Sequence, residues 1–329
     1  MNFLEDISIK KLIELTKTEI KNVKSELDDV TSSMATNANI IITLEADDPS
    51  ILTQAVITAT NVDTEEVIEE FTYDGNSHTI TMPLAIKFKI SCSDIDKYKT
   101  PKAKKYIANG SNPQLITLKY EYGTRYGFKR TKAEASPTGR IEYLFDAVGV
   151  EPAYMDFDND KFEYGGWENF INQVARPVML KYDGTVDYEL DHDNQSLKLD
   201  GTASDISNTS YGGNAMVEFR EFKWVKRYED TNYEYVIFSD VQFDDEYTAY
   251  AHTNENGEIK DAFYWGMFKG TNVNGTLRSM GTGSPMVSQT RNTEVSYAKN
   301  NGSGYYTIYK SGWDFISDLL TLISKSDNS

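Results

Sequence analysis

The stretch Ile40-Ile41-Ile42-Thr43-Leu44-Glu45-Ala46 is where the chain changes from a helix-like pattern to one typical of β-strands. After it, apolar residues recur with a period of two in short runs separated by turn residues such as Asp74-Gly75-Asn76. Further runs of this kind lie at 55–60, 67–73, 79–82, 86–90 and 115–120. Short strands at regular spacing predict an antiparallel, immunoglobulin-like β-sandwich over residues 37–122.

The segment before these strands, residues 3 to about 30, predicts one helix because it has no Gly or Pro and is rich in Glu and Lys. Its apolar residues recur alternately every four and three residues, with Thr16 as the one polar member of this heptad seam. So narrow a stripe favours a coiled coil of several copies, with a trimer expected, or docking on a partner; packing on the neighbouring domain is the alternative. We assign residues 1–36 to oligomerisation or attachment. The seam residues are Ile9, Ile13, Ile20, Val23, Leu27 and Val30.

Residues 123–140 predict a linker after the sandwich, because Gly123, Gly127 and the turn Ser136-Pro137-Thr138-Gly139 interrupt any regular pattern. The basic stretch Lys129-Arg130-Thr131-Lys132 could reach a partner, although a solvated linker is the simpler interpretation.

Aromatic residues and turns are crowded from residue 141 onward, which predicts a mixed α+β domain over residues 141–329. Residues 270–304 are rich in Gly, Asn, Ser and Thr and predict long exposed loops. Apolar residues recur on one helical face over about 312–325 and predict a helix there. Because the sequence stops soon after this helix, it could be a fragment of a longer protein.

Composition excludes several functions. Lys and Arg number 33 and Asp and Glu 51, so the formal net charge is −18, which argues against binding to nucleic-acid backbones. The single cysteine, Cys92, excludes an intramolecular disulfide framework and a Cys-rich zinc site, and the three histidines are scattered. The first residues lack the pattern of a signal peptide, and no apolar run approaches the roughly 20 residues that span a bilayer. We expect a soluble protein made in the cytosol.

Asp156, Asp158 and Asp160 alternate as they do at the head of a calcium loop. The pattern then fails, because no Gly stands at the sixth position and Trp167 occupies the twelfth, where a Glu would be needed. An acidic surface turn is therefore favoured, and calcium is the one cofactor that the pattern would allow. No nucleophile elbow or phosphate-binding glycine loop is present, so we do not expect an enzyme.

Tyr and Trp are abundant, with 22 and 4 residues, and such side chains offer rigid contact area with a polar end. Aromatic faces stack on sugar rings, so a ligand-binding role is one hypothesis and ordinary core packing is the alternative for each residue. The candidates for ligand contact are Trp167, Tyr211, Trp224, Tyr264 and Trp265.

Several strings within residues 125–329 resemble a family of tailed-bacteriophage structural proteins described as tail-fibre, tail-collar, head-fibre or adhesin-like. They are YLFDAVGVEPA (143–153), RPVMLKYDGTVDY (176–188), DGTASD (200–205), GNAMVEF (213–219), LRSMG (277–281) and LLTLISKS (319–326). The resemblance implies a C-type-lectin or formylglycine-generating-enzyme-like fold. Family members continue into Trp- and Gly-rich strands that are missing here, so this fold is expected to be incomplete. The catalytic cysteine pair of the enzyme has no counterpart, because Cys92 lies outside the segment.

These observations together predict a mainly β protein with some α structure, on the surface of a phage virion. Its N-terminal part would attach to the particle through other phage structural proteins and assemble, as a homotrimer, with copies of itself. Its C-terminal domain would bind a host surface polysaccharide. Two alternatives stay open: a purely structural capsid-decoration, baseplate or tail component, and a polysaccharide depolymerase.

Overall fold

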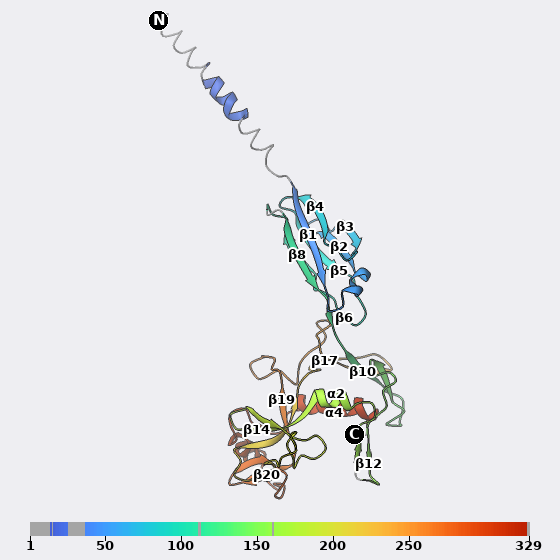
Figure 1. Ribbon diagram of the computed structural model, residues 1–329, viewed down its shortest axis with the longest axis vertical. Helices are drawn as coiled ribbons and strands as arrows, with labels where there is room; N and C mark the ends of the chain where they lie inside the picture. The colour runs from blue at the N-terminus through green and yellow to red at the C-terminus, as the bar shows by residue number, and fades with distance from the viewer. Residues whose placement is uncertain (1–13, 15, 26–36, 111–112, 160, 328–329) are drawn as a thin grey trace, which may run out of the picture. The chain divides into compact units, whose positions relative to one another are not determined.

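The structure is a computed structural model that describes residues 14, 16–25, 37–110, 113–159 and 161–327 (Figure 1). Four seam residues, Ile9, Ile13, Leu27 and Val30, lie outside the described residues, as does Asp160. The chain divides into two compact units, Met1–Tyr122 and Gly123–Ser329, each with its own core. The structure confirms the mainly β class with few helices.

The first unit carries a two-sheet sandwich (Figure 1). One sheet has the order β4-β1-β8 and the other the order β3-β2-β5-β7. Its elements are β1 (Asn37–Glu45), η1 (Pro49–Gln54), β2 (Val56–Asn61), β3 (Val67–Thr72), β4 (His78–Pro83), β5 (Lys87–Cys92), β6 (Tyr98–Lys99), β7 (Lys104–Ile107), β8 (Gln114–Lys119) and β9 (Glu121–Tyr122).

Strand β1 shows why the sandwich forms. Its side chains alternate strictly, and Ile40, Ile42 and Leu44 point into the core with 0%, 0% and 4% exposure. The pairing of β1 with β4 is antiparallel, as expected, but its pairing with β8 is parallel, from Ile40 opposite Gln114 to Glu45 opposite Lys119. A period of two identifies the buried face but does not identify the neighbouring strand, so the all-antiparallel expectation was wrong at this pair.

The N-terminal helix is described at residues 14 and 16–25, and these residues are all exposed. Ile20 and Val23, the two seam residues within this range, each have 63% of their surface exposed. The helix is therefore not stabilised by packing of these two side chains against the sandwich.

The second unit has two four-stranded sheets, with the orders β11-β10-β18-β17 and β15-β14-β16-β19, and two separate hairpins, β12-β13 and β20-β21 (Figure 1). Its strands are β10 (Arg125–Thr131), β11 (Ile141–Phe145), β12 (Tyr154–Asp156), β13 (Lys161–Glu163), β14 (Ala175–Lys181), β15 (Val186–Glu189), β16 (Gly213–Phe219), β17 (Trp224–Glu229), β18 (Tyr233–Ser239), β19 (Phe263–Gly266), β20 (Gly270–Val273) and β21 (Thr276–Ser279). Its helices are α2 (Glu168–Val174), α3 (Arg291–Lys299) and α4 (Lys310–Ser324). Helix α4 is the predicted terminal helix, and its Phe315 and Leu322 are fully buried.

The predicted linker over 123–140 is wrong, because Arg125–Thr131 forms β10, an inner strand of the first sheet of this unit. Phe128 is fully buried in the core. Gly127 is needed for close packing rather than for flexibility, since a Cβ atom there would lie 3.2 Å from the carbonyl oxygen of Val236. The prediction of long loops over 270–304 was likewise wrong in part, because this stretch contains β20, β21 and α3.

A buried carboxyl group makes the stability of the second unit depend on pH. Burial on α4 raises the pKa of Asp318 to about 6, against the opposing effects of the Arg227 and Arg130 guanidinium groups; nearby Asp314 raises it further. The folded state therefore binds a proton more readily than the unfolded state. This tighter binding of a proton by Asp318 stabilises the fold most at pH values below the unfolded pKa of 3.8. The stabilisation is lost as pH rises through 6, the pKa in the folded state.

We expect the Asp318→Asn variant to lose this component. Between pH 7.5 and pH 5 the titration of Asp318 should contribute about 1 kcal/mol to the free energy of unfolding of the wild type. Urea unfolding at the two pH values measures it, with Asp261→Asn, which removes a fully exposed carboxylate from the same unit, as the control. An identical pH dependence in Asp318→Asn and the wild type would contradict the assignment to this residue.

Candidate functional site

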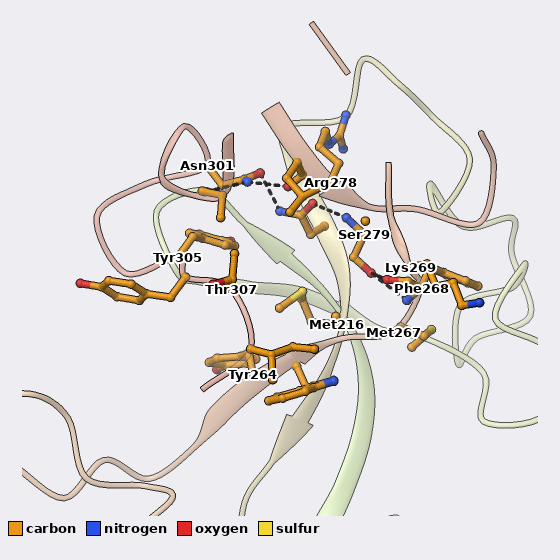
Figure 2. Close-up of a pocket in the computed structure, with 18 of the residues that line it drawn as sticks. Met216, Tyr264, Met267, Phe268, Lys269, Arg278, Ser279, Asn301, Tyr305 and Thr307 are labelled. Carbon is orange, nitrogen blue, oxygen red and sulfur yellow. Dashed lines mark hydrogen bonds between the residues drawn. The ribbon is translucent and has the colours of Figure 1, made fainter. Parts of the chain in front are cut away.

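A cavity of about 630 Å³ lies in the second unit, beside the β16–β19 edge of the second sheet. Hairpin β20-β21, helix α3 and the segment 305–309 complete its walls. Figure 2 shows Tyr305 and Tyr264 on one side of Met216, with Phe268 and Lys269 on the other. The cavity is thus built from segments separated by nearly a hundred residues in sequence.

One wall of the pocket is aromatic. Tyr264 and Trp265 come from β19, while Tyr305, Tyr306 and Tyr309 come from the segment before α4. Burial raises the pKa of Tyr264 and that of Tyr309 to about 12 each, so both phenols stay neutral at physiological pH. The wall offers flat ring faces and hydroxyl groups without charge.

Tyr264 is held by a chain of polar contacts that runs away from the pocket. Its hydroxyl donates to Oε1 of Glu218 at 3.0 Å, and Arg176 Nε donates to Oε2 of Glu218 at 2.7 Å. Arg176 also contacts Glu189 at 3.3 Å, and Glu189 lies 2.8 Å from Nε2 of His192. Because Glu218 is 6% exposed, this chain fixes the position of the Tyr264 ring.

Buried amides form the polar end of the pocket (Figure 2). Asn214 donates from Nδ2 to Oδ1 of Asn301 at 3.0 Å, and Asn301 donates from Nδ2 to the carbonyl of Leu277 at 2.7 Å. The backbone N–H of Ser279 donates to Oδ1 of Asn214 at 3.0 Å. Asn214 and Asn301 are 2% and 3% exposed, so these bonds join β16 and β21 to the residues after α3 and fix the shape of the cavity.

The charged groups that line the pocket are few. Arg278 is 3% exposed and donates to the backbone carbonyls of Thr209, at 2.8 Å, and of Gly213. Across the described part of the chain, neither Lys269 nor Glu294 has an ion-pair partner. Apart from the buried Arg278, the described residues of the pocket thus include one cation and one anion without an ion pair, beside a largely neutral surface.

The structure brings together only two of the predicted ligand residues, Tyr264 and Trp265. Trp167 is 1% exposed and packs against Tyr126 and Phe170 in the core, so its prediction as a ligand residue was wrong. Trp224 and Tyr211 are half-buried and do not line the pocket. The hydroxyl of Tyr211 donates to Asp187 at 3.0 Å, which fixes the ring in place.

Sequence reasoning missed Tyr305, Tyr306 and Tyr309, along with Asn214 and Asn301. The three tyrosines stand within five residues of one another directly after a Gly-Ser-Gly turn, and this density was a usable signal. The two asparagines gave none, because their role depends on contacts between distant segments.

The acidic run at 156–160 lies at hairpin β12-β13. Oδ1 of Asp156 accepts hydrogen bonds from the backbone N–H groups of Asp158 and Asn159, at 3.1 and 3.2 Å, which makes a tight turn. The hydrogen bond from the Asn159 side chain, together with these backbone bonds, holds the pKa of Asp156 below its usual value. Within the described residues no cluster of three metal-binding side chains is found, and calcium at this run stays an untested prediction.

No protein-family model matches the chain, and no curated protein matches it. The shaft pilin SpaA of Lactobacillus rhamnosus GG is 16% identical, with 52% of this chain and 66% of the pilin covered and a TM-score of 0.24. The TIE protein of Bacillus anthracis is 10% identical over 56% of this chain and 28% of its own, with a TM-score of 0.23.

A candidate polysaccharide-binding protein of Bacteroides thetaiotaomicron is also similar, at 10% identity over 64% of this chain and 74% of its own, with a TM-score of 0.23. Similarities at such TM-scores carry no argument about function. Among the described residues, no helix is both long and apolar enough to cross a membrane.

Proposed function

We propose that this protein is a surface fibre or adhesin of a tailed-bacteriophage virion that binds a host glycan in the pocket of its second unit. The observation that carries the binding role is the pocket itself, whose wall is formed by Tyr264, Trp265, Tyr305, Tyr306 and Tyr309. Flat aromatic faces beside fixed polar groups suit the alternating apolar and hydroxyl-bearing faces of a sugar ring. The phage assignment rests on the sequence resemblance, and so does the lectin-like character of the second unit.

The N-terminal helix supports an assembled form of this adhesin. Ile20 and Val23 are exposed in the single chain, so the free energy of burying them is available to a coiled coil. A trimer would present three pockets at once, and effective concentration would turn weak single contacts into stable attachment. Attachment of this helix to another virion protein is the other use of the same exposed seam.

A depolymerase is less well supported by the pocket. Glycoside hydrolysis uses two carboxyl groups that flank the scissile bond. Of the described residues that line the cavity, Glu294 is the one acid, and nearby Glu218 is committed to Arg176 and Tyr264. A decoration or baseplate role without ligand remains the alternative that the experiment below decides.

We expect Trp265→Ala and Tyr306→Ala to weaken glycan binding at least tenfold, because each removes a ring face from the pocket. Tyr306 is 52% exposed, so its removal should leave the fold intact. The measurement is a glycan array with the full chain, followed by calorimetric titration of the best ligand. Phe157→Ala, at the 85% exposed tip of hairpin β12-β13, is the matched control and should bind normally. A wild-type protein that binds no glycan would favour the purely structural role.

A further inference from the structure

An exposed aromatic surface continues from the pocket onto helix α4. The ring of Trp265 lies 6.1 Å from that of Tyr309 and 6.4 Å from that of Trp313, measured between centroids. Trp265 and Tyr309 line the cavity, whereas Trp313 lies outside it and is 55% exposed. The rings therefore form one continuous surface that starts inside the pocket and ends at an indole open to solvent.

Gly312 makes this arrangement possible. A Cβ atom at this position would lie 2.8 Å from Cζ of Tyr309 and 3.0 Å from Cζ3 of Trp265. The helix can approach the two rings closely because it has no side chain there, although glycine is otherwise unfavourable inside a helix. The close packing holds the ring surface against a rigid element.

Few charged side chains on this surface are available to a ligand. Lys310 and Asp314, which flank Trp313 in sequence, pair with one another, and Asp314 also contacts Arg227 at 3.8 Å. The free charges that line the pocket, Lys269 and Glu294, are opposite in sign. Arg278 also lines the pocket without an ion pair among the described residues, but it is 3% exposed and donates to backbone carbonyls. Lys299 lies over the ring of Tyr306, at 5.5 Å from its centroid. The charged residues of the described lining that are not buried are therefore Lys269 and Glu294, and one cation beside one anion does not make a cationic site for an acidic sugar. The net charge of −18 on the whole chain would repel a polyanion.

We infer that the site takes at least two consecutive units of an uncharged oligosaccharide. One unit lies in the pocket against Tyr264, Tyr305 and Trp265, and the next stacks on the exposed indole of Trp313. This inference rests on the proposed glycan-binding function and adds the charge class of the ligand and its minimum length. Single stacking contacts are modest, so the two together are what give the site useful affinity.

The test is calorimetric titration of the full chain with defined probes. The neutral probes are the tetramers of cellulose, starch and chitin with their monomers, and the acidic probe is an alginate tetramer. We expect a neutral tetramer to bind more tightly than its monomer. Trp313→Ala should lower the affinity for that tetramer about tenfold and leave the affinity for the monomer unchanged. Phe157→Ala is the exposed-aromatic control. Gly312→Ala, which crowds Tyr309 and Trp265, should lower the affinity for both the tetramer and the monomer.

Each outcome decides one point. Equal tetramer affinity in Trp313→Ala and wild type, with binding lost in Trp265→Ala, would overturn the second contact and leave glycan binding standing. Tighter binding of the alginate tetramer than of every neutral tetramer would overturn the uncharged class alone. If the wild type binds none of the probes, the inference is overturned. If it also binds no glycan on the wider array, the proposed function is overturned as well.

Discussion

Replacing Ile20 and Val23 together by aspartate is expected to convert the proposed coiled-coil assembly into monomers. Each residue is 63% exposed in the single chain, so the substitution should cost little stability within one molecule. In a coiled coil the same side chains are buried, and burying unpaired carboxylates costs several kcal/mol for each ion. Light scattering coupled to size-exclusion chromatography measures the mass, and circular dichroism checks that the β units remain folded.

The control places the same charges on the opposite side of the helix. Thr18 and Ser25 occupy heptad positions away from the seam, and Thr18→Asp with Ser25→Asp adds the same two carboxylates. This variant should keep the mass of the wild type. A seam variant that stays assembled would show that the helix does not hold the copies together. A monomeric wild type would favour docking of the helix on a different protein.

Truncating Trp167 is expected to destabilise the second unit more than any change to its surface. The indole is 1% exposed and packs edge-to-face on Tyr126, Tyr143 and Phe170, with ring centroids between 5.2 and 5.7 Å apart. Removing a buried Trp leaves a cavity and costs about 3–5 kcal/mol. For a unit of this size, we expect a loss of roughly 6–20 °C in Tm.

Trp313→Ala is the matched comparison, since it removes the same indole from an exposed position in the same unit. Its Tm should lie within about 2 °C of the wild type. Differential scanning calorimetry resolves the two cases. Equal melting of both variants would contradict the burial of Trp167 and would reopen its role at a binding surface.

The sequence predicted local structure better than it predicted neighbours. The alternation in β1 correctly identified Ile40 and Ile42 as residues of a half-buried strand, because period two follows directly from backbone geometry. The parallel partner β8 was not predictable, since pairing depends on which strands come to lie side by side. The mistaken linker has a related cause. Strand β10 contains Gly127 and three basic residues, which hid its strand character, and its inner position follows from its pairing with β11 and β18.

The candidate site was predictable only in part. Tyr264 and Trp265 were selected for their chemistry. The same reasoning selected Trp167, which is buried in the core. Residue type alone cannot separate a stacking platform from core packing, because both use large rings. The buried pair Asn214 and Asn301, 87 positions apart, became recognisable only once the fold had placed the two amides 3.0 Å apart.

The parallel pairing of β1 with β8 also determines how the first unit bears load. Two parallel strands at the start and end of the sandwich mean that the polypeptide enters at one end and leaves at the other. Tension between Asn37 and Lys119 therefore runs along both strands and shears their hydrogen bonds, so that the bonds must fail together. An antiparallel partner in the same place would open like a zipper, one bond at a time. The sandwich is thus built to resist pulling along its length.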